Sequence, residues 1–257
     1  MALLPADKKT SMKTERYQKR SYRGRVNSPD LFKARVAVKE TDLLILTDKP
    51  ADKRFIESRI IFYRDKIEEY VNYKDRRFLV ALKPVAVEST SHRIIKEMAR
   101  QSAKVNVGPM ASVAGAIAQF LGRDLLAKGF RDVIIENGGD IFMKNTRPVK
   151  VGLYAGKNKR LNKINVKIQP ERFSLGICTS SATIGHSVSF GNADNAVIIA
   201  SSAVLADALA TAVCNMVKSA DDIKRAVAFA SSVKGVRGII IIFGNILATW
   251  GKVELCR

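Results

Sequence analysis

The sequence predicts an α+β fold in which antiparallel sheets pack against helices. Long segments carry apolar residues at the spacing of an amphipathic helix, and between them short β-rich segments follow one another directly across polar or glycine-containing turns. Strands joined in this way pair antiparallel, whereas a doubly wound parallel sheet alternates single strands with helices. With 47% hydrophobic and 26% charged residues among 257, the chain has the composition of a globular protein.

The first elements follow from local patterning. Residues 32–39 and 43–47 flank a polar turn and predict a strand pair. Residues 51–73 carry apolar side chains at helical spacing behind an aspartate start signal, which predicts a helix. Residues 78–82 are expected to form a strand that ends before Pro84.

The same two patterns alternate through the rest of the chain. A helix is expected from Ser89 or Ser91, with His92 in an exposed or capping position of its first turn. Residues 110–128 resume a helical pattern whose small side chains permit close packing. Helices are also predicted at 204–217 and 222–232, and strands at 131–136, 141–143, 149–155, 166–168, 174–178, 196–200, 238–243 and 246–250.

We expect one domain behind a basic, flexible arm. The arm is residues 1–28, whose first 25 residues hold eight Lys or Arg against two acids, and the α+β domain is residues 29–257. The apolar start of the chain is too short for a signal peptide, and the apolar run 238–250 is interrupted and too short for a membrane span. The prediction is a cytoplasmic protein without a membrane span, and the sequence leaves its oligomeric state open.

The formal charge of +20 raises the possibility of a nucleic-acid partner. Residues 144–167 hold eight Lys or Arg and no acid, whereas residues 173–217 hold no Lys or Arg at all. This distribution favours attraction of a phosphorylated ligand to a carboxylate-bearing site. Because no aromatic residues are interleaved with the cations of 156–167, a basic nucleic-acid-binding module ranks last among the functions considered.

The cysteines point to a second alternative. Cys178, Cys214 and Cys256 have no short paired spacing, which argues against a disulfide framework and against a zinc site. Cys178 directly precedes a hydroxyl-rich segment, so an enzyme of sulfur metabolism that uses its thiol is one hypothesis. The other interpretation is a buried strand cysteine, which is much commoner.

One helix carries the strongest candidate site. Within the apolar run 201–217, Asp207 and Thr211 lie four residues apart and therefore share one helix face. A carboxylate and a hydroxyl among small side chains suit Mg²⁺, which prefers oxygen ligands. Alternatively, the aspartate caps a neighbouring element and the threonine bonds back to its own helical turn.

Two further segments accompany this helix. Residues 136–141, Glu-Asn-Gly-Gly-Asp-Ile, leave a strand through two glycines that allow close approach of the backbone to a ligand. Residues 178–183, Cys-Thr-Ser-Ser-Ala-Thr, leave another strand toward Gly185 and His186, and their hydroxyls suit a phosphate or a ribose. Taken singly, these segments are also compatible with an ordinary hairpin turn and an ordinary Ser/Thr turn.

Together the three segments resemble the ApbE-like superfamily, whose best-understood members are flavin transferases. The matching features are Gly-Gly-Asp-Ile at 138–141, Thr-Ser-Ser at 179–181 with a following histidine, and Ala-Asp-Ala-Leu-Ala-Thr at 206–211. The stretches 105–111 and 113–118 resemble more closely the short, uncharacterised branch of that superfamily. The resemblance covers roughly residues 30–250 and implies a T-fold-type domain.

The resemblance also implies a chemistry. Mg²⁺ would lie between Asp207, Thr211 and the backbone at Gly139, and would polarise the diphosphate of FAD or a related dinucleotide while FMN passes to a Thr or Ser of an acceptor protein. Asp207 and His186 would be the catalytic residues. FAD or FMN would be bound by residues of the turn and of the hydroxyl-rich segment, namely Asn137, Gly138, Gly139, Asp140, Thr179, Ser180 and Ser181.

The sequence departs from the transferases at several positions. Their Ala-Lys-Gly-Tyr block corresponds to residues 113–116, Val-Ala-Gly-Ala, which lack both the lysine and the tyrosine. Their Thr-Ser-Gly corresponds to residues 179–181, Thr-Ser-Ser, and their Asp-Pro and Thr-Gly are missing after His186. These changes put flavin recognition and transfer to an acceptor in doubt, more than the fold or the metal-bearing helix.

Overall fold

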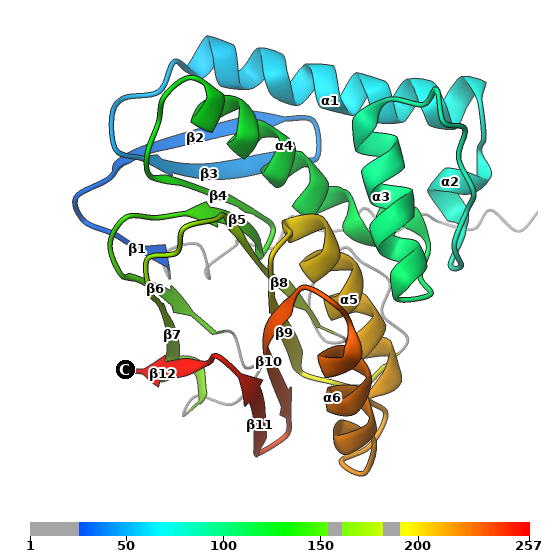
Figure 1. Cartoon of the computed structure of the whole chain (residues 1–257), viewed down its shortest axis with the longest axis vertical. Coiled ribbons are helices and arrows are strands. Elements are labelled where there is room, and N and C mark those ends of the chain that lie inside the picture. The colour runs from blue at the N-terminus through cyan, green and yellow to red at the C-terminus, as the bar shows by residue number, and fades with distance from the viewer. Residues whose placement is uncertain (1–25, 154–160, 182–190) are drawn as a thin grey trace, which may run out of the picture.

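The computed structural model describes residues 26–153, 161–181 and 191–257 (Figure 1). Its strands are β1 (Val26–Asn27), β2 (Phe32–Val38), β3 (Thr41–Thr47), β4 (Val133–Asn137), β5 (Asp140–Lys144), β6 (Val149–Gly152), β7 (Asn165–Ile168), β8 (Leu175–Ser180), β9 (Asn195–Ala200), β10 (Val236–Phe243), β11 (Ile246–Gly251) and β12 (Glu254–Cys256). Its α-helices are α1 (Lys53–Tyr73), α2 (Arg77–Val80), α3 (Arg93–Lys104), α4 (Val113–Ala127), α5 (Ala203–Met216) and α6 (Asp222–Ser232), with short 3₁₀ turns η2 (Pro109–Ser112) and η3 (Leu161–Lys163).

Two antiparallel sheets organise the chain. The larger, eight-stranded sheet has the order β11-β10-β9-β8-β5-β4-β3-β2, and the smaller, four-stranded sheet has the order β1-β6-β7-β12. Every neighbouring pair in the described part of the chain is antiparallel. The predicted α+β class with antiparallel sheets and packed helices is therefore confirmed.

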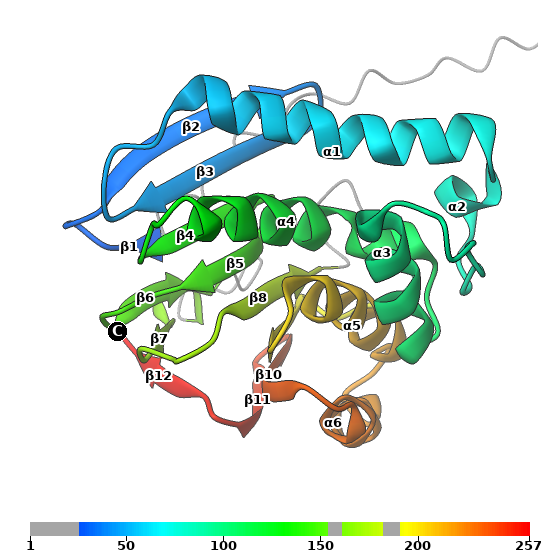
Figure 2. The same cartoon turned by 45° about the horizontal axis from the view of Figure 1, so that its top comes forward.

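The larger sheet is the middle layer. On one face α1 lies against β2, α4 against β4 and β5, α5 against β8 and β9, and α6 against β10 (Figures 1 and 2). Apolar side chains of the other face meet those of the smaller sheet in a second core. Because side chains alternate along a strand, Ile135 belongs to the core beneath the helices and Ile134 to the core between the sheets. Strand β4 is accordingly buried on both faces.

Most predicted elements are present with shifted ends, but one prediction is wrong. Residues 78–82, expected as a strand, form the short helix α2 followed by extended backbone at Ala81. The carboxylate of Asp75 accepts a hydrogen bond from the backbone N–H of Arg77 at 2.9 Å and starts the helical turn. Phe78 is fully buried, whereas Val80 is 67% exposed, so a single anchor holds the segment without a partner strand.

Two other predictions concern the start of α3 and the possibility of a membrane-spanning helix. His92 caps α3, because its Nδ1 accepts a hydrogen bond from the N–H of Ile94 at 3.3 Å. Within the described ranges no single helix is long and apolar enough to cross a membrane, and only the bent pair 93–104 and 109–127 meets the length and composition requirement, with its two helices taken together.

Candidate functional site

Most of the predicted site residues that the structure describes lie on β4, β5, β8 and α5 and face the helical side of the larger sheet. Asp207 projects from α5 toward the start of α4, where its Oδ2 accepts a hydrogen bond from the backbone N–H of Gly115 at 2.8 Å. The N–H of Ala114 also contributes to this interaction. The Asp207 carboxylate thus caps the first turn of α4, the structural alternative considered for it from the sequence.

Gly115 makes this contact possible. A Cβ atom at Gly115 would lie 2.4 Å from the carbonyl oxygen of Ala203 and 2.9 Å from the Cβ of Asp207. Real side chains do not approach so closely, so only glycine permits α4 and α5 to lie at this distance. Gly115 occupies the block in which the ApbE transferases also carry a glycine, although the flanking lysine and tyrosine are absent here.

A buried glutamine fixes α5 against α4. The Oε1 of Gln119 accepts hydrogen bonds from the N–H of Ala203 at 2.8 Å and from the hydroxyl of Ser202 at 3.0 Å. Both partners stand at the N-terminus of α5, so Gln119 satisfies a free helix-end donor and fixes the helix that carries Asp207. The sequence analysis missed this residue; its signal is a lone amide in an otherwise apolar helical stretch.

The Gly-Gly turn connects β4 to β5 beside these helices. Gly138 and Gly139 have φ values of +69° and +106°, in the region that favours glycine. The side chain of Glu136 accepts a hydrogen bond from the N–H of Gly139 at 2.7 Å, and the side-chain amide of Asn137 donates to the carbonyl of Ala114 at 3.1 Å. A Cβ at Gly138 would meet no atom within 4 Å, so this turn offers open backbone to a ligand.

Asp140 brings the turn and the end of β8 together. Its Oδ1 accepts a hydrogen bond from the backbone N–H of Thr179 at 3.3 Å. Strand β8 runs two residues further than predicted, to Ser180, and strand alternation turns Cys178 and Ser180 toward the helices and Thr179 toward the other face. Of the predicted hydroxyl residues, Ser180 therefore shares the face of Asp140, while Ser181 follows the strand end.

Asp140 and Asp207 form a pair of interacting buried carboxyl groups. Burial, partly offset by the Thr179 amide, raises the pKa of Asp140 to about 7, and the nearby Glu136 adds to the rise. Burial also raises the pKa of Asp207 well above its usual range, with repulsion by Asp140 as the second cause. Neither carboxylate forms an ion pair with Lys, Arg or His in the part of the chain that the structure describes.

The donor set around this pair fits a hard divalent cation. We call Asp140, Asp207, Thr211 and the Gly138–Gly139 turn the carboxylate site. Two carboxylates, a half-buried hydroxyl and open backbone are oxygen donors of the kind that Mg²⁺ takes. Residues 26–153, 161–181 and 191–257 contain no cluster of three or more His, Cys, Asp or Glu side chains that could hold a metal ion, so the hydroxyl of Thr211 and backbone oxygens would have to complete the donor set around the two carboxylates.

The remaining predicted residues divide between buried and undescribed positions. Cys178 is fully buried, with its sulfur 3.3 Å from the carbonyl oxygen of Ala203. Burial raises the pKa of its thiol further above the usual value, and the charges of Asp140 and Asp207 act in the same direction. The environment therefore opposes the thiolate that sulfur transfer requires. His186 lies outside the described residues.

Comparison with known proteins places the chain in a family. A family model described as AbpE bacteria matches residues 24–235. The chain belongs to this family. The UPF0280 protein of Methanocaldococcus jannaschii is 40% identical over 227 residues, which cover 86% of this chain and 91% of the relative. The UPF0280 protein of Methanocella arvoryzae is 33% identical and covers 89% of this chain and 93% of the relative.

Solved structures show that this AbpE family member has the ApbE fold. The flavin transferase ApbE from Vibrio cholerae superposes with a TM-score of 0.59 at 13% identity, covering 88% of this chain and 97% of that protein. The ApbE protein from Thermotoga maritima gives a TM-score of 0.58 at 13% identity, with coverages of 87% and 96%. The predicted membership of the ApbE-like superfamily is thus confirmed.

Proposed function

We propose that this AbpE family member is a Mg²⁺-dependent enzyme that acts on FAD or a related dinucleotide diphosphate and transfers FMN to a hydroxyl of an acceptor protein. The observation that carries the proposal is the pair of buried carboxylates, Asp140 and Asp207, for which the described residues supply no counter-charge. A pair of repelling buried carboxylates costs stability unless a cation or protons neutralise it. The matched protein from Vibrio cholerae, which has the same fold, is named a flavin transferase.

The residues of the carboxylate site would hold the metal and the diphosphate. Asp140, Asp207 and the hydroxyl of Thr211 would bind Mg²⁺, which supplies charge neutralisation at the phosphoryl group when bound. The open backbone at Gly138 would contact the diphosphate, and the hydroxyl of Ser180 faces the same side of the sheet. Asn137 holds the turn against α4 through Ala114.

The transfer exchanges one phosphorus–oxygen bond for another. The oxygen of the acceptor hydroxyl bonds to the FMN phosphorus, and the bond from that phosphorus to the AMP oxygen breaks, so that AMP leaves with the electron pair. We assign to His186 the role of taking the hydroxyl proton, because its ordinary pKa lies near neutrality. Asp207 stays bound to the start of α4 and keeps the helix that carries Thr211 in place.

The test is incubation of the purified chain with FAD and Mg²⁺ while FMN, AMP and flavin-labelled protein are measured. Asp207→Asn keeps an oxygen that caps α4 but removes the charge, so Mg²⁺-dependent turnover should fall by at least about tenfold, the scale of effects in metal sites. Thr211→Val should act in the same direction, and Thr211→Ser should retain activity because it keeps the hydroxyl.

Asp65→Asn is the matched control. Asp65 is exposed on α1, so this substitution removes the same charge outside the carboxylate site. The proposal fails if the wild-type chain neither binds nor turns over FAD with Mg²⁺ present. It also fails in its metal assignment if Asp207→Asn and Asp65→Asn show the same Mg²⁺ dependence as the wild type.

A further inference from the structure

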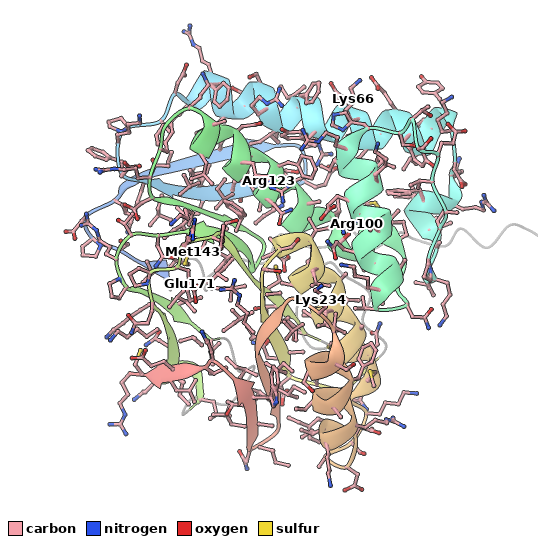
Figure 3. All side chains as sticks on the ribbon, in the orientation of Figure 1. Lys66, Arg100, Arg123, Met143, Glu171 and Lys234 are labelled. Atoms are coloured by element: carbon pink, nitrogen blue, oxygen red, sulfur yellow. The ribbon has the colours of Figure 1, made fainter. Side chains whose placement is uncertain are left out.

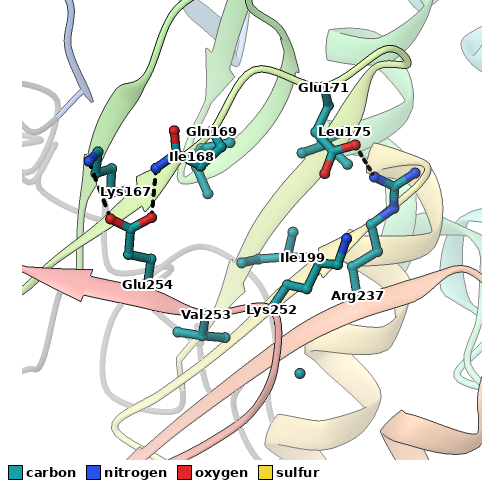
Figure 4. A pocket seen from close by; sticks show the side chains of 11 residues that line it. Lys167, Ile168, Gln169, Glu171, Leu175, Ile199, Arg237, Lys252, Val253 and Glu254 are labelled. Atoms are coloured by element: carbon teal, nitrogen blue, oxygen red, sulfur yellow. Dashed lines mark hydrogen bonds and ion pairs between the residues drawn. The ribbon is translucent and has the colours of Figure 1, made fainter.

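A concave site lies on the face of the larger sheet opposite the carboxylate site. A pocket of about 420 Å³ opens where β7 and β12 of the smaller sheet face β8, β9 and β10 (Figure 4). Its apolar floor, Leu175 and Ile199, belongs to the core between the two sheets. Asp207 lies on α5, on the other side of the sheet, so the pocket is separate from the site described above.

Charged side chains surround this floor. Lys167, Arg237 and Lys252 line the pocket together with Glu171 and Glu254, which gives one more cation than anion. Glu171 pairs with Arg237 at 2.9 Å, and Glu254 pairs with Lys167 at 3.3 Å. Both carboxylates are therefore already neutralised within the pocket.

Lys252 carries the surplus charge. Its ammonium group forms no hydrogen bond or ion pair with any residue of the described ranges, and Figure 4 shows its side chain reaching toward Arg237 beside the floor. The Arg237 guanidinium has five N–H donors, of which the pairing with Glu171 uses only a part. Lys252 and Arg237 therefore have N–H donors available next to the apolar floor of Leu175 and Ile199, which Val253 extends.

We propose that this pocket binds a small organic monocarboxylate, with the carboxylate between Lys252 and Arg237 and the apolar body on Leu175, Ile199 and Val253. A single negative charge balances the surplus cation, and a carboxylate matches the planar donor fork of arginine. The volume falls in the range of small-molecule sites, about 300–1,000 Å³. A cationic ligand would have to displace Lys167 or Arg237 from its carboxylate, and a dianion would leave the pocket with an excess negative charge.

The test uses phenylacetate as the probe and the methyl resonances of isotope-labelled Ile, Leu and Val as the readout. Phenylacetate should shift the methyl signals of Leu175, Ile199 and Val253 in a saturable way, whereas the signal of Ile60, a buried residue of α1, should stay unchanged. Phenethyl alcohol and phenethylamine, which have the same apolar body with no charge or a positive charge, should bind at least about fivefold more weakly.

Lys252→Gln should weaken phenylacetate binding at least about fivefold, since it removes the unpaired cation from an exposed position without touching the core. Lys83→Gln removes the same charge from an exposed loop after α2 and should leave the affinity unchanged. The proposal is overturned if the pocket methyls do not shift, if the alcohol binds as well as the acid, or if Lys252→Gln has the affinity of the wild type. None of these outcomes depends on FAD or Mg²⁺.

Discussion

Asp140 and Asp207 are two acidic side chains that the fold buries, and no Lys, Arg or His of the described ranges forms an ion pair with either. Burial is the main reason that both carboxyl groups resist ionisation, and each adds to the pKa of its neighbours. Such an arrangement costs stability in the metal-free protein at neutral pH. The same two negative charges would attract a divalent cation, so this loss of stability agrees with a role of the two carboxylates in binding a metal ion.

Replacing Asp140 by asparagine tests this cost through the pH dependence of stability. The folded-state pKa of about 7 lies above the ordinary value of 3.8, so the folded state binds more protons between these values and wild-type stability falls as pH rises through them. Asp140→Asn removes this dependence, so its stability gain over the wild type should be small at about pH 4 and grow by up to about 1.4 kcal/mol per pH unit toward about pH 7.

Urea unfolding at a series of pH values, without added metal, measures this difference. Asp65→Asn should give curves parallel to the wild type, because that residue is exposed. Saturating Mg²⁺ at about pH 8 should stabilise the wild type more than Asp140→Asn. A gain for Asp140→Asn that is constant across the whole pH range would contradict the assigned burial of the charge.

The packing of helix α4 against helix α5 sets the geometry of the carboxylate site. Three contacts fix it: the Asp207 carboxylate on the start of α4, the Gln119 amide on the start of α5, and the close approach at Gly115. Each joins residues that are far apart in the chain. The face of α5 that carries Asp207 and Thr211 is therefore positioned by the neighbouring helix and not by its own sequence.

Gly115→Ala tests the close approach. On an open helix, exchange of glycine for alanine stabilises by about 1 kcal/mol. Here the added Cβ would lie 2.4 Å from the carbonyl oxygen of Ala203, so we expect a destabilisation of about 1–3 kcal/mol together with weaker Mg²⁺ binding. Urea unfolding and a Mg²⁺ titration measure the two effects.

Gly244→Ala serves for comparison, because Gly244 has a φ of +59° with no atom within 4 Å of an added Cβ. It should cost about 1 kcal/mol from backbone strain alone and leave Mg²⁺ binding unchanged. If Gly115→Ala were as stable as the wild type, the contact between α4 and α5 would be looser than the structure has it.

Positive charge is spread widely over the whole molecule. Figure 3 labels cations on different elements of the helical side, with Lys66 on α1, Arg100 on α3 and Arg123 on α4. Several cations are already paired, including Arg100 with Glu97 at 2.7 Å and Arg147 with Asp30 at 3.1 Å. In the described part of the basic segment 144–167, Arg147 lies between β5 and β6, and β6 and β7 lie across the larger sheet from Asp207.

This distribution predicts two separable kinds of binding. A single-stranded oligonucleotide should bind through general charge, and its affinity should fall by more than about tenfold between about 0.05 and about 0.2 M KCl. Fluorescence anisotropy should give the same salt dependence for Asp207→Asn and for the wild type. FAD binding with Mg²⁺ should instead depend on Asp207. Oligonucleotide binding that survives high salt would favour the nucleic-acid module that ranks last here.

The sequence by itself determined the features that depend on hydrophobic periodicity and on turn residues, because both act within a few residues along the chain. The antiparallel class, α1, α5, the hairpin around Gly138 and Gly139, and the order of the three site segments are all predictable at this range. The segment 78–82 was mispredicted because its apolar residues suit a strand as well as a short helix. The decision there rests on the hydrogen bond from the N–H of Arg77 to the Asp75 carboxylate and on the burial of Phe78.

Only the tertiary structure decided which groups meet. The hydrogen bond from Gly115 to Asp207 spans 92 positions of the chain, and that from Thr179 to Asp140 spans 39. Contacts of this kind depend on how helices and sheets pack, which local patterning does not specify. The role of Gln119, the charge balance of the carboxylate pair and the pocket at Lys252 therefore follow from the packed layers. The sequence supplied the chemical groups, and packing of distant segments placed them together.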